Sequence, residues 1–557
     1  MNTKDNEVKR LSQVENFNQL RRNFPVTEMV TVYLSDNDWS DTATTYAYGI
    51  YAALIPSTQI EQVLARPSWD FSHGDGYPGA IQHHRNGEWV TKYCRFGDNS
   101  GIEPLIIDRD FNGMRPNYME VSEEFRLFHR LYHDRKDDKY IKIDDDGNEQ
   151  VVIIMEPNRI QIRQKEIRQF LAIKEMHLAI QFDYLEYSQF SLEDLGFKVG
   201  GDVQHEDLLC WHLYYVSTEV FCSYNSFSQL LGKQLIAPLP KEKSGMWGFA
   251  QEKPKKYVYF IIGVGNDGEE IIYTSDPNQL ADFFGANPDA PLYITAVYFR
   301  KTVLDKYYQQ PGKFSVKDSR LDCGSLWGMC IDNHHSDKVC AWLGHLGSLP
   351  YEEQLHWRGH NIAPVGTISE TYFKRQIMGE FADSDRPEHN FGIYYSQLHQ
   401  VCNQKLNWQL LLPLAKEDEH HLQSIRIPST GGQKDFDDLI LALTKLLVDS
   451  LNEKELNKII PKDECESIKG SISRLERVFQ ICSIQAYEDH IKFLRNLQDL
   501  RSAGAAHRKG SKYQKVAKIF DIQNKSLPLV FEGILVESNE FLQFLVEVVR
   551  CGKLSTN

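Results

Sequence analysis

The sequence predicts a multidomain α+β protein, with a mixed α/β N-terminal region followed by an all-α helical bundle at the C-terminus. The chain has 557 residues, which is too long for one ordinary core. Its first 430 residues mix alternating runs typical of strands with helical patterns, whereas only helical periodicity follows. We divide the chain into residues 1–200, 201–430 and 431–557. The middle part is either a second α+β domain or a continuation of the first.

Composition and charge indicate a globular, cytoplasmic protein. Hydrophobic residues make up 41% of the chain, charged residues 25%, and the net charge is −15. Ten cysteines in a chain of this length fit a reducing compartment. The sequence contains no apolar run of about 18 residues, and its first ten residues are polar, so we expect no membrane segment. An acidic chain is not a general nucleic-acid binder, although a local basic site stays possible.

Residues 1–200 alternate between strand and helix patterns. Phe125, Phe128, Leu131 and Tyr132 recur at helical spacing after Ser122, a residue that often caps helices. Two β-rich runs around a glycine-containing turn predict a hairpin over 139–155. The other elements expected here are a strand over 26–39, a short strand and turn over 103–113, a helix over 164–175 and a strand over 176–187.

Residues 201–430 continue in the same style. The pattern predicts a hairpin over 255–276, a short helix after Asp276, a strand over 292–299, and helices over 350–360 and 369–381. The segment 428–435, "PSTGGQKD", is rich in turn residues and predicts a linker.

After this linker the periodicity is helical throughout. An apolar stripe predicts the first helix and consists of Phe436, Leu439, Ile440, Leu443, Leu446, Leu447 and Leu451. Further helices are expected over 467–482, 485–502, 512–520 and 538–550. Four to five helices in about 125 residues predict a helical bundle. This part carries 19 Lys and Arg against 18 Asp and Glu, so its net charge is +1 within a chain of −15.

Two glycine-containing motifs resemble ligand loops. "GVGNDG", Gly263 to Gly268, has the glycine spacing of a dinucleotide loop, but a second strand follows it where that loop requires a helix. "DRDFNG", Asp108 to Gly113, begins like a calcium loop, but Met119 occupies the position of the bidentate Glu. We interpret the first motif as a hairpin turn and the second as an ordinary turn.

A third motif offers metal-ligating residue types. It consists of Cys323, Cys330, His334, His335, Cys340, His345, His356 and His360. A zinc site could be drawn from these residues, but the chain has no CxxC pair, and Trp357 stands in "HWRGH" where a metalloprotease helix carries Glu. We favour buried cysteines and hydrogen-bonded histidines, and predict no metal and no cofactor. A zinc enzyme or a zinc-stabilised domain is the less favoured hypothesis.

A basic segment near the C-terminus is the strongest functional candidate. Between Arg501 and Phe520 the chain has six Lys or Arg and no Asp or Glu. Such a segment also fits the exposed basic end of a helix, where cations are favourable. The alternative is an RNA site, because Arg501 can hold a phosphate and His507 can move a proton to or from the RNA 2′-OH. The residues predicted to attract RNA phosphates are Arg508, Lys509, Lys512 and Lys515.

An Arg and a His separated by five residues, late in a small helical bundle, resemble the HEPN superfamily. The resemblance covers about residues 434–550, and the remainder resembles no family of known function. Ser502 departs from the pattern, since the family commonly has Asn, Asp or His directly after the Arg. Members are compact, often dimeric helical domains. Many are metal-independent endoribonucleases of bacterial defence and toxin systems, in which two protomers build one composite site.

The resemblance implies two alternative functions. In the first, the bundle is an endoribonuclease in antiphage defence of the abortive-infection type, acts as a homodimer with Arg501 and His507 as catalytic residues, and is controlled by an N-terminal region that senses a phage-derived trigger. In the second, the bundle is a non-catalytic dimerisation or nucleic-acid-binding module. The expected partners are RNA, the trigger and a second copy of the chain.

Overall fold

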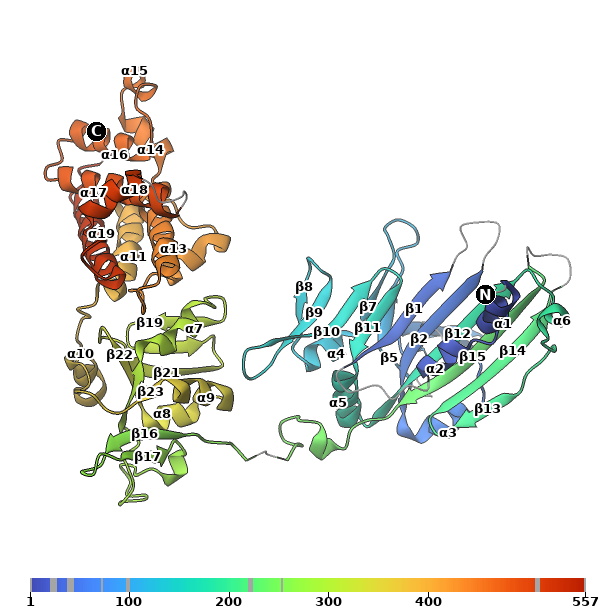
Figure 1. Cartoon of the computed structure of the whole chain (residues 1–557). Helices are drawn as coiled ribbons and strands as arrows, with labels where there is room; N and C mark the ends of the chain where they lie inside the picture. The colour runs from blue at the N-terminus through green and yellow to red at the C-terminus, as the bar shows by residue number, and fades with distance from the viewer. Residues whose placement is uncertain are drawn as a thin grey trace. The chain divides into compact units, whose positions relative to one another are not determined.

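The computed structural model describes residues 3–20, 28–37, 45–71, 74–96, 101–218, 224–251, 254–505 and 511–554. The chain forms two compact units, Met1–Pro254 and Lys255–Asn557. Large antiparallel sheets with helices make up the N-terminal region, and the part after about residue 370 is mostly helical (Figure 1). The predicted fold class is therefore confirmed.

The first unit is built on one large antiparallel sheet. Its strand order is β13-β14-β15-β12-β2-β1-β11-β10-β9-β8, and β5 pairs with β2. The strands are β1 (Met29–Asn37), β2 (Tyr46–Pro56), β5 (Glu103–Pro104), β8 (Tyr132–Asp134), β9 (Lys139–Ile143), β10 (Glu149–Glu156), β11 (Arg159–Arg163), β12 (Met176–Ser188), β13 (Val203–Glu206), β14 (Leu209–Ser217) and β15 (Ser226–Ile236). Strand β12 pairs with β15 from Leu178 to Ser188, so the sheet continues across residue 200 up to Ile236.

Helices complete the core of this unit. They are α1 (Thr3–Leu11), α2 (Val14–Leu20), α3 (Ile60–Leu64), α4 (Glu123–Phe128), α5 (Gln164–Lys174) and α6 (Leu192–Leu195). Helix α5 buries Ile167, Phe170 and Leu171 in the core of the sheet. Gln13, between α1 and α2, donates to the carbonyl of Tyr184 at 2.6 Å, which fixes these helices on β12. The helix α4 ends at Phe128 because Arg130 adopts a left-handed φ of 51°, so Tyr132 lies in β8 and not in the expected helix.

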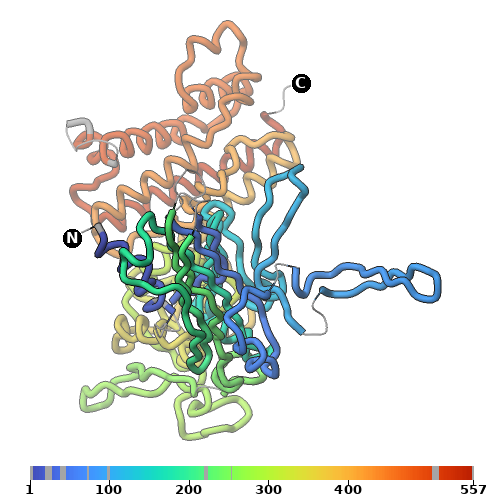
Figure 2. The backbone as a smooth tube through the Cα atoms, turned by 90° about the vertical axis from the view of Figure 1, so that its right-hand side faces the viewer, coloured from blue at the N-terminus to red at the C-terminus, as the bar shows by residue number. Residues whose placement is uncertain are grey.

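Two hairpins leave the sheet. Strands β3 (Pro78–Arg85) and β4 (Glu88–Arg95) form a long hairpin that stands away from it and is exposed along almost its whole length (Figure 2). Strands β6 (Ile106–Arg109) and β7 (Tyr118–Val121) form the second hairpin. The motif "DRDFNG" lies at its turn, where Asp110 accepts from the backbone N–H of Asn112 at 2.9 Å. This is the turn chemistry that the sequence indicates.

The second unit begins with a smaller antiparallel sheet of order β19-β20-β21-β22-β18-β23. Its strands are β18 (Ala296–Arg300), β19 (Phe314–Lys317), β20 (Arg320–Cys323), β21 (Trp327–Asp332), β22 (Lys338–Trp342) and β23 (Asn361–Ile362), and its helices are α7 (Asp305–Tyr308), α8 (Leu343–Ser348), α9 (Tyr351–His360) and α10 (Glu370–Phe373). Strands β16 (Tyr259–Val264) and β17 (Glu270–Thr274) pair as a hairpin. "GVGNDG" connects them, as predicted.

The helical bundle forms the rest of this unit. Its helices are α11 (Pro387–Lys405), α12 (Glu419–Gln423), α13 (Gln433–Thr444), α14 (Glu453–Ile459), α15 (Lys462–Cys465), α16 (Ser471–Ile481), α17 (Glu488–Leu500), α18 (Ser511–Ile519) and α19 (Leu527–Arg550). Helices α11, α13, α17 and α19 lie side by side (Figure 1). Every residue of the predicted stripe from Phe436 to Leu451 is buried in their core. Helix α11 shares this core through Phe391, Tyr395 and Leu398, so the bundle begins before the predicted residue 431. Throughout the described residues, no helix has both the length and the apolar character needed to cross a membrane.

Candidate functional site

The structure describes only part of the predicted RNA site. His507, Arg508 and Lys509 lie outside the described residues, and so does the side chain of Lys512. Lys515 is exposed on α18. Helix α17 begins at Glu488, so Ala486, which has a φ of 59°, precedes the helix that was expected from 485.

Arg501 follows directly after α17. The apolar side of α17 buries Ile491, Leu494, Leu497 and Leu500, which anchors the helix in the bundle. The helix then changes into a π-helical turn, Arg501–Ala505. π-Helical turns are rare in proteins, and those that occur are often found at functional sites.

The guanidinium of Arg501 pairs with Asp449 of the neighbouring segment. Arg501 Nη1 lies 3.0 Å and 3.1 Å from the two carboxylate oxygens. Asp449 ends a second π-helical turn, Lys445–Asp449, which continues α13. The two side chains keep 30% and 39% of their surface exposed. An ion pair this exposed contributes only about 0–1 kcal/mol to stability, so the arginine is available to another anion.

The turn after Arg501 is packed against α18. A Cβ atom added to Gly504 would lie 3.2 Å from the ring of Tyr513, so the glycine permits the close approach of that ring. Tyr513 on α18 therefore lies against the π-helical turn that begins at Arg501.

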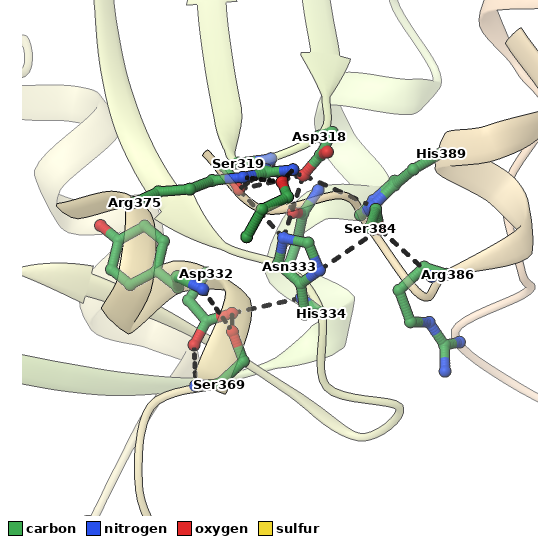
Figure 3. A network of polar contacts seen from close by, with 12 residues as sticks. Asp318, Ser319, Asp332, Asn333, His334, Ser369, Arg375, Ser384, Arg386 and His389 are labelled. Atoms are coloured by element: carbon green, nitrogen blue, oxygen red, sulfur yellow. Dashed lines mark hydrogen bonds and ion pairs between the residues drawn. The ribbon is translucent and has the colours of Figure 1, made fainter. Parts of the chain in front are cut away.

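A second cluster of polar side chains lies where the small sheet meets the bundle (Figure 3). Asp318 and Ser319 form the turn between β19 and β20, and His334 follows β21. Ser384 precedes α11, and His389 lies in its first turn. Arg375 reaches the cluster from a π-helical turn, Lys374–Met378, which continues α10. Among these residues, only His334 belongs to the cysteine and histidine motif of the sequence.

The carboxylate of Asp318 is the centre of this cluster. Its Oδ1 atom lies 2.9 Å from His334 Nε2, 2.7 Å from Arg375 Nη1 and 3.6 Å from His389 Nδ1. The hydroxyl of Ser319 is 3.0 Å from the same oxygen. Burial would raise the pKa of Asp318, but the hydrogen bonds from His334 and Arg375 outweigh it and lower that pKa well below its usual value. Asp318 is therefore a carboxylate at neutral pH.

The two histidines face each other across Ser384. The Ser384 hydroxyl is 2.8 Å from His389 Nδ1 and 3.4 Å from His334 Nδ1. The imidazole rings are edge to face, with 5.1 Å between their centres. Their side chains are only 5% and 7% exposed. Burial lowers the pKa of His389 to about 3, so its ring is neutral and keeps one nitrogen lone pair at neutral pH.

Backbone and amide groups hold this arrangement in place. Ser319 has a left-handed φ of 59°, which is uncommon for a residue with a side chain. Its backbone N–H donates to Asn333 Oδ1 at 3.0 Å. Asn333 in turn donates to the carbonyl of Lys317 at 3.0 Å. The turn that carries Asp318 is therefore fixed to the segment that carries His334.

Asp332 anchors the helix that carries Arg375. This carboxylate is fully buried and accepts from the backbone N–H of Ser369 at 2.7 Å and from its hydroxyl at 2.8 Å. Ser369 caps α10 by accepting from the N–H of Tyr372. Burial would raise the pKa of Asp332, but hydrogen bonds from His335 and Ser369 outweigh it and lower that pKa. Asp332, His335 and Cys340 are side chains of metal-ligating types that lie close together. They lie beside the cluster around Asp318, because Asp332 accepts from the backbone N–H of His334.

The other residues of the cysteine and histidine motif lie elsewhere in the fold. Cys323 is buried in the core of the small sheet. His356 and His360 share one side of α9, as their spacing indicates, with 4.8 Å between their ring centres. His356 Nε2 lies 2.9 Å from the carbonyl of Val303. These residues are thus buried or hydrogen bonded, which is the interpretation that the sequence favours.

Comparison of the chain with protein-family models, with curated proteins and with solved structures finds no match.

Proposed function

We propose that the helical bundle binds RNA and cleaves it without a metal ion. Arg501 holds the phosphate at the cleaved bond, and His507 transfers the proton. The cationic residues that attract the rest of the RNA backbone are Arg508, Lys509, Lys512 and Lys515. These residue roles are taken from the resemblance to the HEPN superfamily.

The observation that carries the proposal is the placement of Arg501. A helix anchored in the core by its apolar side ends directly before this residue, so the side chain leaves a rigid element. Its carboxylate partner Asp449 is more than a third exposed, and a phosphate can replace it at little cost. A guanidinium placed in this way can stabilise the charge that develops on a phosphodiester during cleavage.

The chemistry needs no further group. RNA supplies its own nucleophile, the 2′-OH, and a neutral imidazole accepts its proton as the 2′-oxygen attacks the phosphorus. The bond from phosphorus to the 5′-oxygen breaks, and this oxygen takes a proton from an imidazolium or from water. Contact between Gly504 and Tyr513 supports a site here, because it brings the basic helix α18 against the turn that begins at Arg501. We further propose that two copies of the chain form the working site. In this scheme the first 430 residues keep the nuclease inactive until they sense a phage-derived trigger, in a cytoplasmic defence system.

The experiment is RNA cleavage by the purified full chain in EDTA, with and without an extract of phage-infected cells as the source of the trigger, and with RNA binding measured in parallel. With the extract, wild type should cleave, His507→Gln should bind without cleaving, and His490→Gln should behave like wild type. His490 is a suitable control because it lies on α17, where its ring packs on Phe544. Binding without cleavage by the wild type would support the non-catalytic module instead. Failure to bind RNA would refute both functions.

A further inference from the structure

The cluster around Asp318 contains three metal-ligand atoms that all lie within 4.8 Å of one another. His334 Nε2 and His389 Nδ1 lie 2.9 Å and 3.6 Å from Asp318 Oδ1. In a tetrahedral zinc site with bonds of about 2.0–2.1 Å, neighbouring ligand atoms lie about 3.3–3.4 Å apart. The two distances bracket this value. We propose that Asp318, His334 and His389 bind one divalent transition-metal ion of the Zn²⁺ type.

The residue types of the three side chains match this role. Two imidazole nitrogens and one carboxylate form a common ligand set of zinc and other first-row metals. Three protein ligands leave one coordination position open.

The surrounding side chains resemble the outer shell of a metal site. Metal-bound histidines usually use their second ring nitrogen in a hydrogen bond. His334 fits, since Nε2 faces Asp318 while Nδ1 faces the Ser384 hydroxyl. For His389 the ion would replace Ser384 as the partner of Nδ1. Arg375 and the Ser319 hydroxyl donate to Asp318 Oδ1, the oxygen that faces the histidines, so the ion would share this oxygen with them. The Ser319 hydroxyl also lies 3.0 Å from His334 Nε2, where the ion would replace it.

An ion has a way into the site. The two histidines are almost fully buried, but the side chains of Asp318 and Arg375 are each 23% exposed. Arg375 has a second partner besides Asp318, because its Nε donates to the carbonyl of Ala382 at 2.8 Å. The carboxylate therefore faces both solvent and the two rings. This site is independent of Arg501 and of the proposed RNA cleavage, which is measured in EDTA.

The test uses the full chain after removal of bound metals with a chelator. Zn²⁺ affinity is measured by competition with a coloured chelator, and Co²⁺ is added as a spectroscopic probe of coordination. We expect one equivalent of Zn²⁺, and a Co²⁺ absorption spectrum typical of four-coordinate sites. His389→Gln and Asp318→Asn should abolish both signals. Ser384→Ala should weaken binding about 10–100-fold, the usual effect of losing an outer-shell partner.

The matched control is His399→Gln. His399 lies on the same helix as His389, is partly buried, and pairs with Gln409 at 2.7 Å. The His399→Gln variant should bind metal like wild type. A wild type without stoichiometric Zn²⁺, or a His389→Gln variant that retains it, would overturn the proposal, and the cluster would then be a hydrogen-bonded network. Circular dichroism without metal checks that each variant is folded. If His389→Gln and Asp318→Asn are unfolded, the Zn²⁺ affinity of the milder Ser384→Ala variant tests the proposal.

Discussion

Arg501 and Asp449 form an ion pair in which each partner belongs to a π-helical turn. Arg501 begins the turn that follows α17, and Asp449 ends the turn that continues α13. Both helices are anchored in the same core, so the two side chains are brought together by packing and not by their own attraction. The Arg501 guanidinium is therefore held close to the surface, and another anion can replace its partner Asp449.

Removing the carboxylate should strengthen RNA binding. In Asp449→Asn the guanidinium of Arg501 loses a competing anion and a source of repulsion for phosphates, so we expect RNA to bind severalfold more tightly. Stability should change by less than about 1 kcal/mol, because the pair is exposed. Fluorescence anisotropy with labelled single-stranded RNA measures the affinity. Weaker binding by Asp449→Asn would mean that this carboxylate helps to position Arg501 and does not compete with RNA.

Two glycines of the second unit should respond oppositely to alanine. A Cβ at Gly347, in α8, would lie 1.9 Å from the carbonyl oxygen of Ser275, which is backbone and cannot move aside alone. We expect Gly347→Ala to cost about 1–3 kcal/mol, as overpacking does. Gly359 is exposed in α9 with no atom within 4 Å of its added Cβ. Gly359→Ala should stabilise by up to about 1 kcal/mol, because alanine favours helix.

Thermal unfolding of the full chain compares the two variants with wild type. Equal melting temperatures for both variants would show that α8 does not pack as closely on Ser275 as the structure has it.

Acid should destabilise the first unit through His129. This side chain is buried among Phe125, Phe128 and Phe170, and its Nε2 lies 2.9 Å from the carbonyl of Glu166. Burial, helped by the charge of Lys142, lowers its pKa from 6.5 to about 3. Between these two values the unfolded chain binds one proton more than the folded chain. The free energy of unfolding therefore falls as the pH falls below about 6.5.

The expected loss is about 1–2 kcal/mol between about pH 7 and pH 5, since one pKa unit corresponds to about 1.4 kcal/mol. Urea unfolding followed by circular dichroism at both pH values measures it. The His129→Gln variant should lose this part of the pH dependence. The control is His205→Gln, which should keep it, because His205 is exposed on β13. An unchanged pH dependence in His129→Gln would show that other groups cause the acid sensitivity.

Local patterns predicted much of the fold. The stripe from Phe436 to Leu451 is buried as its spacing indicates, and "GVGNDG" connects two strands because the following run alternates. The sequence does not indicate that α11 belongs to the bundle, because this helix has polar residues between its buried positions and only a weak apolar stripe. Only packing against α19 shows that it belongs to the bundle.

The candidate sites differ in how far the sequence could locate them. Arg501 is visible in a cationic run, because charge clustering along the chain is a local signal. No local signal in the sequence identifies Asp449 as its partner, because a π-helical turn brings Asp449 close to Arg501. Asp318, His334 and His389 lie on three separate segments, and no spacing rule connects them. Asp318 in a turn and a histidine in the first turn of a helix look ordinary until the fold brings them together.

The most direct test of the proposed RNA site compares two arginines of the same region. Arg495 on α17 pairs with Glu476, as Arg501 pairs with Asp449, so Arg495→Gln and Arg501→Gln remove the same charge from similar ion pairs. RNA affinity is measured for both variants over a range of salt concentrations. If Arg501 binds a phosphate, Arg501→Gln should weaken binding and reduce the slope of log K against log salt by about 0.7, the value for one phosphate of a single strand. Arg495→Gln should leave both quantities unchanged. Equal affinity and slope in Arg501→Gln and wild type would contradict the proposed RNA site.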